Sequence, residues 1–160
     1  NESKSAVAKP WSRKFLGYSF WVGKEGAVKR RVAPKAMRRL KERIREITRR
    51  KKGKSMKAVF AELRSYLRGW KEYFGLADTP GKFRELDGWI RRRLIAVQLK
   101  QWKCGTTAYG KLRALGVPKR PSCAAAAHVR SWWRTAAHGA LKAAFPISYF
   151  DLMEVPRLAA

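Results

Sequence analysis

The sequence predicts a mainly α-helical protein with a small β-hairpin near its N-terminal end. In the stretch 56–97, apolar residues recur every three or four positions, as in helices that bury one face. Between residues 11 and 32, aromatic and β-branched residues cluster around turn residues, which is typical of paired strands. The chain has 160 residues, of which 46% are hydrophobic and seven are Trp, so it can bury a core.

The first expected elements are two strands of a hairpin, Trp11–Val22 and Ala27–Val32. An isolated hairpin is marginally stable in water, so we expect it to rest on another surface, such as a preceding sheet. Pro34 then begins a helix that we expect to reach about Lys52. Its narrow apolar stripe is Met37, Leu40, Ile44 and Ile47.

The central feature is a pair of helices joined by a tight turn, within the stretch Leu67–Leu94 and its flanks. Ser55 can cap the first helix, which runs from Met56 to Phe74. Gly69 inside this helix predicts the close approach of another group. The second helix begins at Pro80, with Asp78 and Thr79 as candidate caps, and reaches residues 101–103.

Beyond Cys104 the basic helices end and a part rich in Ala and Trp begins. We expect a short helix, Thr106–Leu115, which stops before Gly116. A further helix capped by Ser122 is expected to run to about Ala137. The tail, Phe145–Ala160, is expected to be irregular and held by its aromatic residues.

The charge of the chain restricts its function. Lys and Arg number 38 against 11 Asp and Glu, a formal net charge of +27. Because such a charge repels itself in a compact fold, it indicates a polyanionic partner. No apolar run approaches the roughly 18 residues of a membrane span, and no signal peptide opens the chain. We therefore expect no membrane partner.

Residues for bond chemistry are missing. The three aspartates, Asp78, Asp87 and Asp151, stand apart, so the sequence shows no paired-carboxylate metal site. His128 and His138 are ten positions apart and share no helix turn. Cys104 and Cys123 have no ligand spacing and are expected to be free, buried thiols. We expect no enzyme activity, no cofactor and no metal.

Binding residues are abundant. Between Pro34 and Lys54 there are 11 Lys and Arg against two Glu. Three segments supply the candidate RNA-binding residues, which are Arg38, Arg39, Lys41, Arg43, Arg45, Arg49, Arg50, Lys51, Lys52, Arg91, Arg92, Arg93, Lys111, Arg113, Lys119 and Arg120. The alternative for the first segment is a solvated face, and for Arg91–Arg93 an ion pair with Glu72 or Glu62. Five tryptophans could stack on bases, but their helical spacing favours core packing: Trp70, Trp89, Trp102, Trp132 and Trp133.

Several segments together resemble the C-terminal part of group II intron-encoded reverse transcriptases. RGWKEYF (Arg68–Phe74), the helix from Pro80 and RRRL (Arg91–Leu94) are similar to the maturase-specific region. FLGYSF (Phe15–Phe20), preceded by Asn1–Val7, resembles the end of the palm, and Ser131–Leu158 resembles the C-terminal maturase end. The Tyr-x-Asp-Asp polymerase motif, the fingers and the Cys/His-rich endonuclease are absent from the sequence.

The resemblance implies a palm remnant at 1–33, thumb and maturase-specific helices at 34–103, and a C-terminal maturase extension at 104–160. It also implies a splicing cofactor that binds group II intron RNA and stabilises its active fold, while the RNA performs the chemistry. Further partners that it allows are target DNA, a template–primer duplex and a separate palm-and-fingers chain. The expected location is the bacterial cytoplasm, or an organelle in a eukaryote.

Two alternatives remain open from the sequence. The chain could be a reverse-transcriptase thumb that grips template–primer duplex only with its missing palm. It could instead be a structural protein of a large RNA assembly, such as a ribosomal protein, although seven Trp argue against this class. An intron RNA encoded around or beside the gene would favour the maturase.

Overall fold

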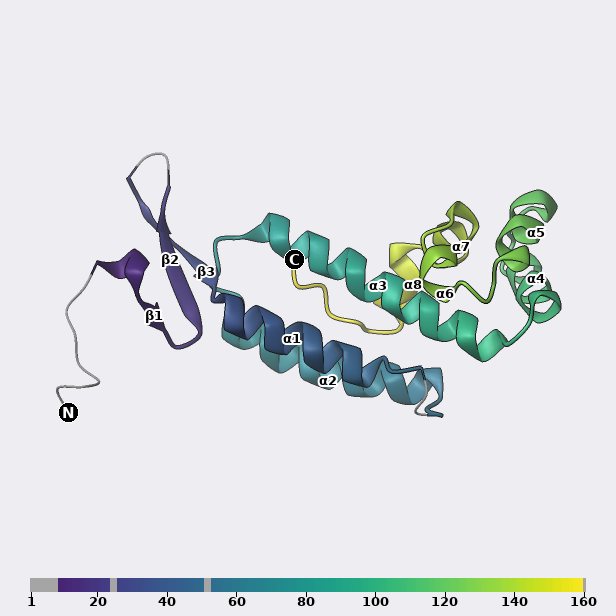
Figure 1. Cartoon of the computed structure of the whole chain (residues 1–160), viewed down its shortest axis with the longest axis horizontal. Coiled ribbons are helices and arrows are strands. Elements are labelled where there is room, and N and C mark those ends of the chain that lie inside the picture. Colours follow the sequence, from purple (N-terminus) through teal and green to yellow (C-terminus); the bar gives the residue numbers. More distant parts are fainter. Residues whose placement is uncertain (1–8, 24–25, 51–52, 160) are drawn as a thin grey trace.

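The computed structural model describes residues 9–23, 26–50 and 53–159, and it confirms a mainly helical chain with a small N-terminal sheet (Figure 1). The candidate residues Lys51 and Lys52, and the segment Asn1–Val7, lie outside these ranges. After a short 3-10 turn, η1 (Pro10–Ser12), three antiparallel strands follow in the order β1 (Lys14–Phe15), β2 (Tyr18–Val22) and β3 (Val28–Val32). The expected hairpin therefore gains a third strand. Tyr18 pairs with Val32 and Val22 with Val28.

The sheet rests on the C-terminal end of the second helix. The Tyr18 hydroxyl donates to the Tyr73 carbonyl oxygen at 2.5 Å, and the Tyr18 and Phe74 ring centroids are 5.3 Å apart. Gly17 adopts a φ of +80°, and a Cβ there would lie 3.1 Å from the Phe74 ring. A side chain at this turn would therefore strain the backbone and push the sheet off the helix.

Three long helices form the body of the molecule: α1 (Pro34–Ile47), α2 (Met56–Phe74) and α3 (Pro80–Trp102). They bury the predicted apolar faces, and Leu40, Ile44 and Ile47 of α1 are fully buried. The Ser55 oxygen accepts from the Ala58 N–H at 3.2 Å, which confirms the predicted cap of α2. Thr79 precedes α3 without a side-chain cap bond.

Helix α1 ends five residues earlier than expected. The Thr48 hydroxyl donates to the Ile44 carbonyl oxygen at 2.5 Å, and the Arg49 N–H closes a tighter turn onto the Glu46 oxygen. A threonine hydroxyl that bonds the carbonyl oxygen four residues earlier competes with the backbone hydrogen bonds that would continue the helix. The expectation for Gly69 was also wrong, because a Cβ built there meets no atom within 4 Å.

The C-terminal third forms α4 (Gly105–Ala114), α5 (Lys119–Ala127), α6 (Trp132–Thr135), α7 (Gly139–Ala144) and α8 (Ile147–Leu152). The helix expected to begin after Ser122 was wrong. Ser122 is buried inside α5 and donates to the Val117 carbonyl oxygen, and the chain turns between α5 and α6, where Thr135 donates to the His128 oxygen. The tail is only partly irregular, because Pro146 precedes the helical turn α8.

One hydrophobic cluster runs from Val32 to Leu158 and joins the three long helices to the C-terminal part. The last segment returns between α2 and α3 (Figure 1). Both cysteines are free, as expected, but they are exposed rather than buried. Hydrogen bonds from the Thr106 and Thr107 side chains lower the pKa of the Cys104 thiol to about 7.

Candidate nucleic-acid interface

The cations of α1 lie on two sides of the helix. Arg38, Lys41 and Arg45 follow one another at spacings of three and four, so they share one side. Arg39 and Arg43 share another. All five are exposed except Lys41, which is half-buried. The single basic face expected from the sequence is therefore two stripes with different neighbours.

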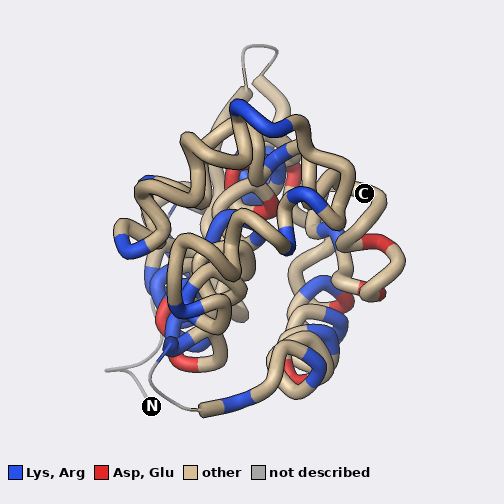
Figure 2. The backbone as a smooth tube through the Cα atoms, turned by 90° about the vertical axis from the view of Figure 1, so that its right-hand side faces the viewer, with Lys and Arg blue, Asp and Glu red and all other residues tan. Residues whose placement is uncertain are grey.

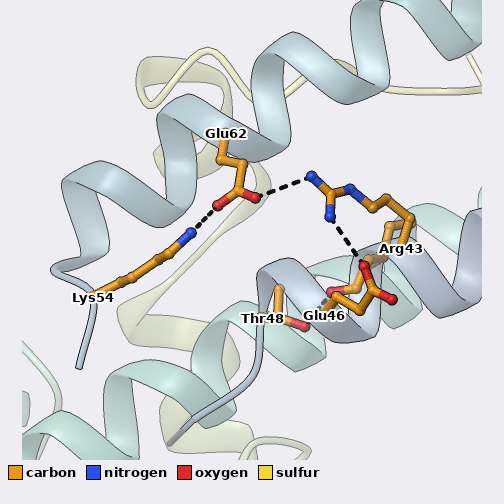
Figure 3. A network of polar contacts seen from close by, with 6 residues as sticks. Arg43, Glu46, Thr48, Lys54 and Glu62 are labelled. Atoms are coloured by element: carbon orange, nitrogen blue, oxygen red, sulfur yellow. Dashed lines mark hydrogen bonds and ion pairs between the residues drawn. The ribbon is translucent and has the colours of Figure 1, made fainter. Parts of the chain in front are cut away.

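The stripe with Arg43 faces α2 and is tied to it. The Arg43 guanidinium pairs with Glu46 at 3.0 Å and with Glu62 of α2 at 3.3 Å, and Glu62 also pairs with Lys54 (Figure 3). The Glu46 contact is the largest cause of a raised pKa at Arg43. Arg43 therefore connects α1 to α2, and Glu62 also holds the linker residue Lys54.

The stripe with Arg45 meets α3. The guanidinium carbon of Arg45 lies 5.6 Å from the ring centroid of Trp89, and that of Arg93 lies 5.3 Å from the same centroid. The Arg93 Nε donates to the Thr48 hydroxyl at 2.6 Å. The structure thus brings the end of α1 together with one of the three arginines at 91–93.

Those three arginines point in three directions, because neighbours on a helix are turned by about 100°. Arg93 faces α1, whereas Arg92 donates to the Trp133 carbonyl oxygen through Nε at 3.0 Å and Nη2 at 2.8 Å. Arg91 lines a pocket with Phe150 of α8. The run therefore connects α3 to its surroundings, and Arg92 and Arg93 are anchored by these contacts rather than by the acid partners considered from the sequence.

The tryptophans divide between the core and this surface. Trp70 and Trp102 are buried, as expected, but Trp133 is 40% exposed. The Arg92 guanidinium lies 4.1 Å from the Trp133 ring centroid, and Arg50 and Lys100 lie 4.8 and 4.5 Å from that of Trp132. Core packing was thus the wrong expectation for Trp133.

Sequence reasoning missed Lys100 as a member of this surface, and it favoured the core for Trp89, Trp132 and Trp133. The spacing of Trp89 and Arg93, four residues on one helix, was the available signal. Nothing local in the sequence pairs Arg92 with Trp133, which is 41 residues away.

The last predicted group flanks the turn between α4 and α5, beyond the end of α3. Arg113 donates to the Val117 carbonyl oxygen at 2.7 Å and closes the turn. The other three side chains are exposed: Lys111, Lys119 and Arg120. They form a separate basic region, and the structure does not bring them to the α1–α3 surface (Figure 1).

The electrostatic balance favours an anionic partner. Lys and Arg positions occur along the whole backbone, whereas acidic positions are few (Figure 2). Arg38, Arg39, Lys41 and Arg49 make no ion pair with another described residue. Within the described ranges, no three His, Cys, Asp or Glu side chains gather as a metal site requires, and no helix has the length and apolar character to cross a membrane.

The sequence was compared with protein-family models and with curated proteins. A search of curated proteins found no match. The family model described as "Group II intron, maturase-specific domain" matches residues 37–116. This span begins in α1, contains α2, α3 and α4, and covers half of the chain. The protein therefore belongs to the group II intron maturase-specific domain family.

Proposed function

We propose that the chain binds group II intron RNA and stabilises its splicing-active fold, while the RNA supplies the chemistry. The family is associated with group II intron splicing, and its domain is not itself catalytic. The observation that carries the proposal is the surface of α1 and α3, where Arg38, Lys41, Arg45 and Arg93 lie on connected faces without carboxylate partners among the described residues. Cations left without acids neutralise phosphates and release counterions. The protein would act where the intron is spliced, in a bacterial cytoplasm or an organelle.

The test replaces only cations that make no internal contact. The triple variant Arg38→Gln, Lys41→Gln and Arg49→Gln keeps the Arg43 ion pairs and the Arg45 and Arg93 contacts. We expect weaker binding to intron RNA. The slope of log affinity against log salt concentration should also become smaller in magnitude by up to about three, roughly one for each lost phosphate contact. Binding titrations at several salt concentrations, with circular dichroism as the folding check, measure both.

The matched control removes three exposed cations from other faces: Lys57→Gln, Arg68→Gln and Arg84→Gln. It has the same net charge, so any excess effect of the first variant belongs to the α1 surface. Equal losses in the two variants would mean that only net charge matters. A splicing assay with the same intron then tests whether weaker binding lowers activity.

One observation favours the reverse-transcriptase thumb as a second candidate. The N-terminal sheet and its turn expose large apolar side chains that a further protein part could cover: Phe15, Leu16, Trp21, Val22 and Val28. A thumb would bind an RNA–DNA duplex as tightly as intron RNA, whereas a maturase would favour the intron. Competition between the two nucleic acids decides between them.

A further inference from the structure

A small concavity opens where the end of α1, α3 and α6 meet. Its volume is about 160 Å³, and its lining is Thr48, Arg50, Trp89, Arg93, Ala96 and Trp133. This is below the roughly 300–1,000 Å³ of pockets that enclose a whole small molecule. The site therefore suits one phosphate or one ring of a larger ligand. It has two arginines and two tryptophans in its lining and no carboxylate.

The cations of the concavity are positioned and electrostatically uncompensated. The Arg93 side chain is half-buried, its Nε donates to Thr48 Oγ1, and its Nη2 lies 3.5 Å from the Arg45 carbonyl oxygen. Burial lowers the pKa of Arg93, and the charges of Arg45 and Arg50 lower it further. Arg50 makes no hydrogen bond to another described residue, so its guanidinium donors are available. An anion between Arg50 and Arg93 would relieve this repulsion.

The aromatic wall is fixed as well. Two hydrogen bonds from Arg92 hold the Trp133 carbonyl group, and the same guanidinium stacks at 4.1 Å from the ring centroid. Trp133 nevertheless keeps 40% of its surface exposed. An exposed, immobilised indole beside guanidinium groups has the chemistry that stacks an unpaired base next to its phosphate.

We propose that this concavity binds one unpaired nucleotide of RNA, with its phosphate between Arg50 and Arg93 and its base stacked on Trp133. The inference rests on the proposed function for RNA as the ligand, but it concerns a single-stranded nucleotide rather than the duplex backbone. It predicts that the chain distinguishes single strands from duplexes at this one place, while the α1 cations bind either form.

The test uses an oligouridylate of about eight nucleotides and a duplex RNA of the same length as probes. Trp133→Leu and Arg50→Gln are each expected to weaken single-strand binding about tenfold. Arg84→Gln removes the same charge from an exposed position outside the concavity, and Trp21→Leu removes another exposed indole from the distant sheet. These controls are expected to change single-strand affinity less than threefold. Duplex affinity should not respond to Trp133→Leu.

An unchanged single-strand affinity in Trp133→Leu, or equal losses in Arg50→Gln and Arg84→Gln, would overturn the proposal. A measurement on the unaltered chain guards against misfolded variants: an oligonucleotide carrying 4-thiouridine should photo-crosslink at Trp133, and a crosslink confined to other segments counts against the site. The two proposals fail separately. If Trp133→Leu and Arg50→Gln leave single-strand affinity unchanged while the chain still binds the intron, only this inference is rejected. If both variants weaken single-strand binding but the chain shows no preference for the intron, only the proposed function is rejected.

Discussion

At the scale of single residues, Asp87 shows how one buried carboxylate fixes the end of the chain. Its two oxygens accept the backbone N–H groups of Leu158 at 3.0 Å and Ala159 at 3.2 Å. Asp87 is 7% exposed, so these bonds lie in a region where an unpaired polar group is costly. The returning C-terminal segment is therefore held to α3 by a charge-assisted contact that its sequence does not reveal.

Replacing this carboxylate should release the segment. We expect Asp87→Ala to lower the free energy of unfolding by about 2 kcal/mol, because the buried N–H of Leu158 and the half-buried N–H of Ala159 lose a charged acceptor. The C-terminal residues should also become sensitive to carboxypeptidase. The control, Glu85→Ala on the same helix, breaks only an exposed ion pair with Lys82 and should have a much smaller effect. Denaturant titration measures the change, and similar losses in both variants would contradict the assignment.

Residue roles were the part of the site that the sequence predicted least well. Composition and spacing treat Arg38 and Arg43 as equivalent cations, but Arg43 pairs with Glu62, 19 residues away, and Arg38 makes no ion pair within the described ranges. The difference depends on which side of α1 meets α2, which is a tertiary fact. The same holds for Trp133, whose helical context suggested burial although α6 places it at the surface.

At the scale of elements, the long helices were predictable because their apolar residues recur with the helical period. The limits of α2 and α3 were confirmed, including the cap at Ser55 and the start at Pro80. The errors fall where short-range signals compete. Helix α1 ended early at Thr48, and the N-cap of α5, Pro118, lies four positions before the predicted cap at Ser122. In the short C-terminal helices, packing on α3 and α4 outweighs local propensity.

Asp78 provides a second attachment of the sheet to the helices, beside the contact of Tyr18 with the end of α2. Its carboxylate accepts the backbone N–H of Arg30 at 2.8 Å, and this bond is the largest cause of its lowered pKa. A lowered folded-state pKa means that the contact stabilises the sheet fully above the unfolded value of about 3.9 and is lost as the pH falls through the folded value. We expect the β3 amide resonances to shift in that acid range.

Asp78→Asn should remove this pH dependence from the β3 resonances in NMR spectra. Asp151→Asn is the matched control, since the hydrogen bond from Arg157 lowers the pKa of this carboxylate in α8, away from β3. That variant should change the acid response of the C-terminal segment and leave β3 unaffected. An identical β3 titration in wild type and Asp78→Asn would show that the Asp78 carboxylate does not cause the acid response of β3.

At the scale of the whole molecule, the net charge of +27 destabilises the compact fold through self-repulsion, and it favours the binding of RNA. Seven ion pairs occur among the described residues, but the excess of 27 positive charges remains after every acid in the chain is counted. Salt should therefore stabilise the free chain, because raising the ionic strength from 0.01 to 0.1 M shortens the screening length from about 30 to about 10 Å. Each kcal/mol of repulsion removed should raise the Tm by about 2–4 °C.

We expect the triple variant Arg38→Gln, Lys41→Gln and Arg49→Gln to be more stable than the wild type without RNA, and to gain less stability than the wild type when RNA binds. Without RNA it should melt at a higher temperature than the wild type at low salt, because it carries three fewer repelling charges and loses no ion pair of the described chain. With intron RNA at about a hundred times the Kd, the wild type should gain about 2.7 kcal/mol, and the variant less at the same concentration. Thermal melts at low salt, with and without RNA, measure both differences. A variant that melts lower than the wild type in the absence of RNA would mean that these cations stabilise the fold itself, and that the α1 surface is structural before it is an RNA site.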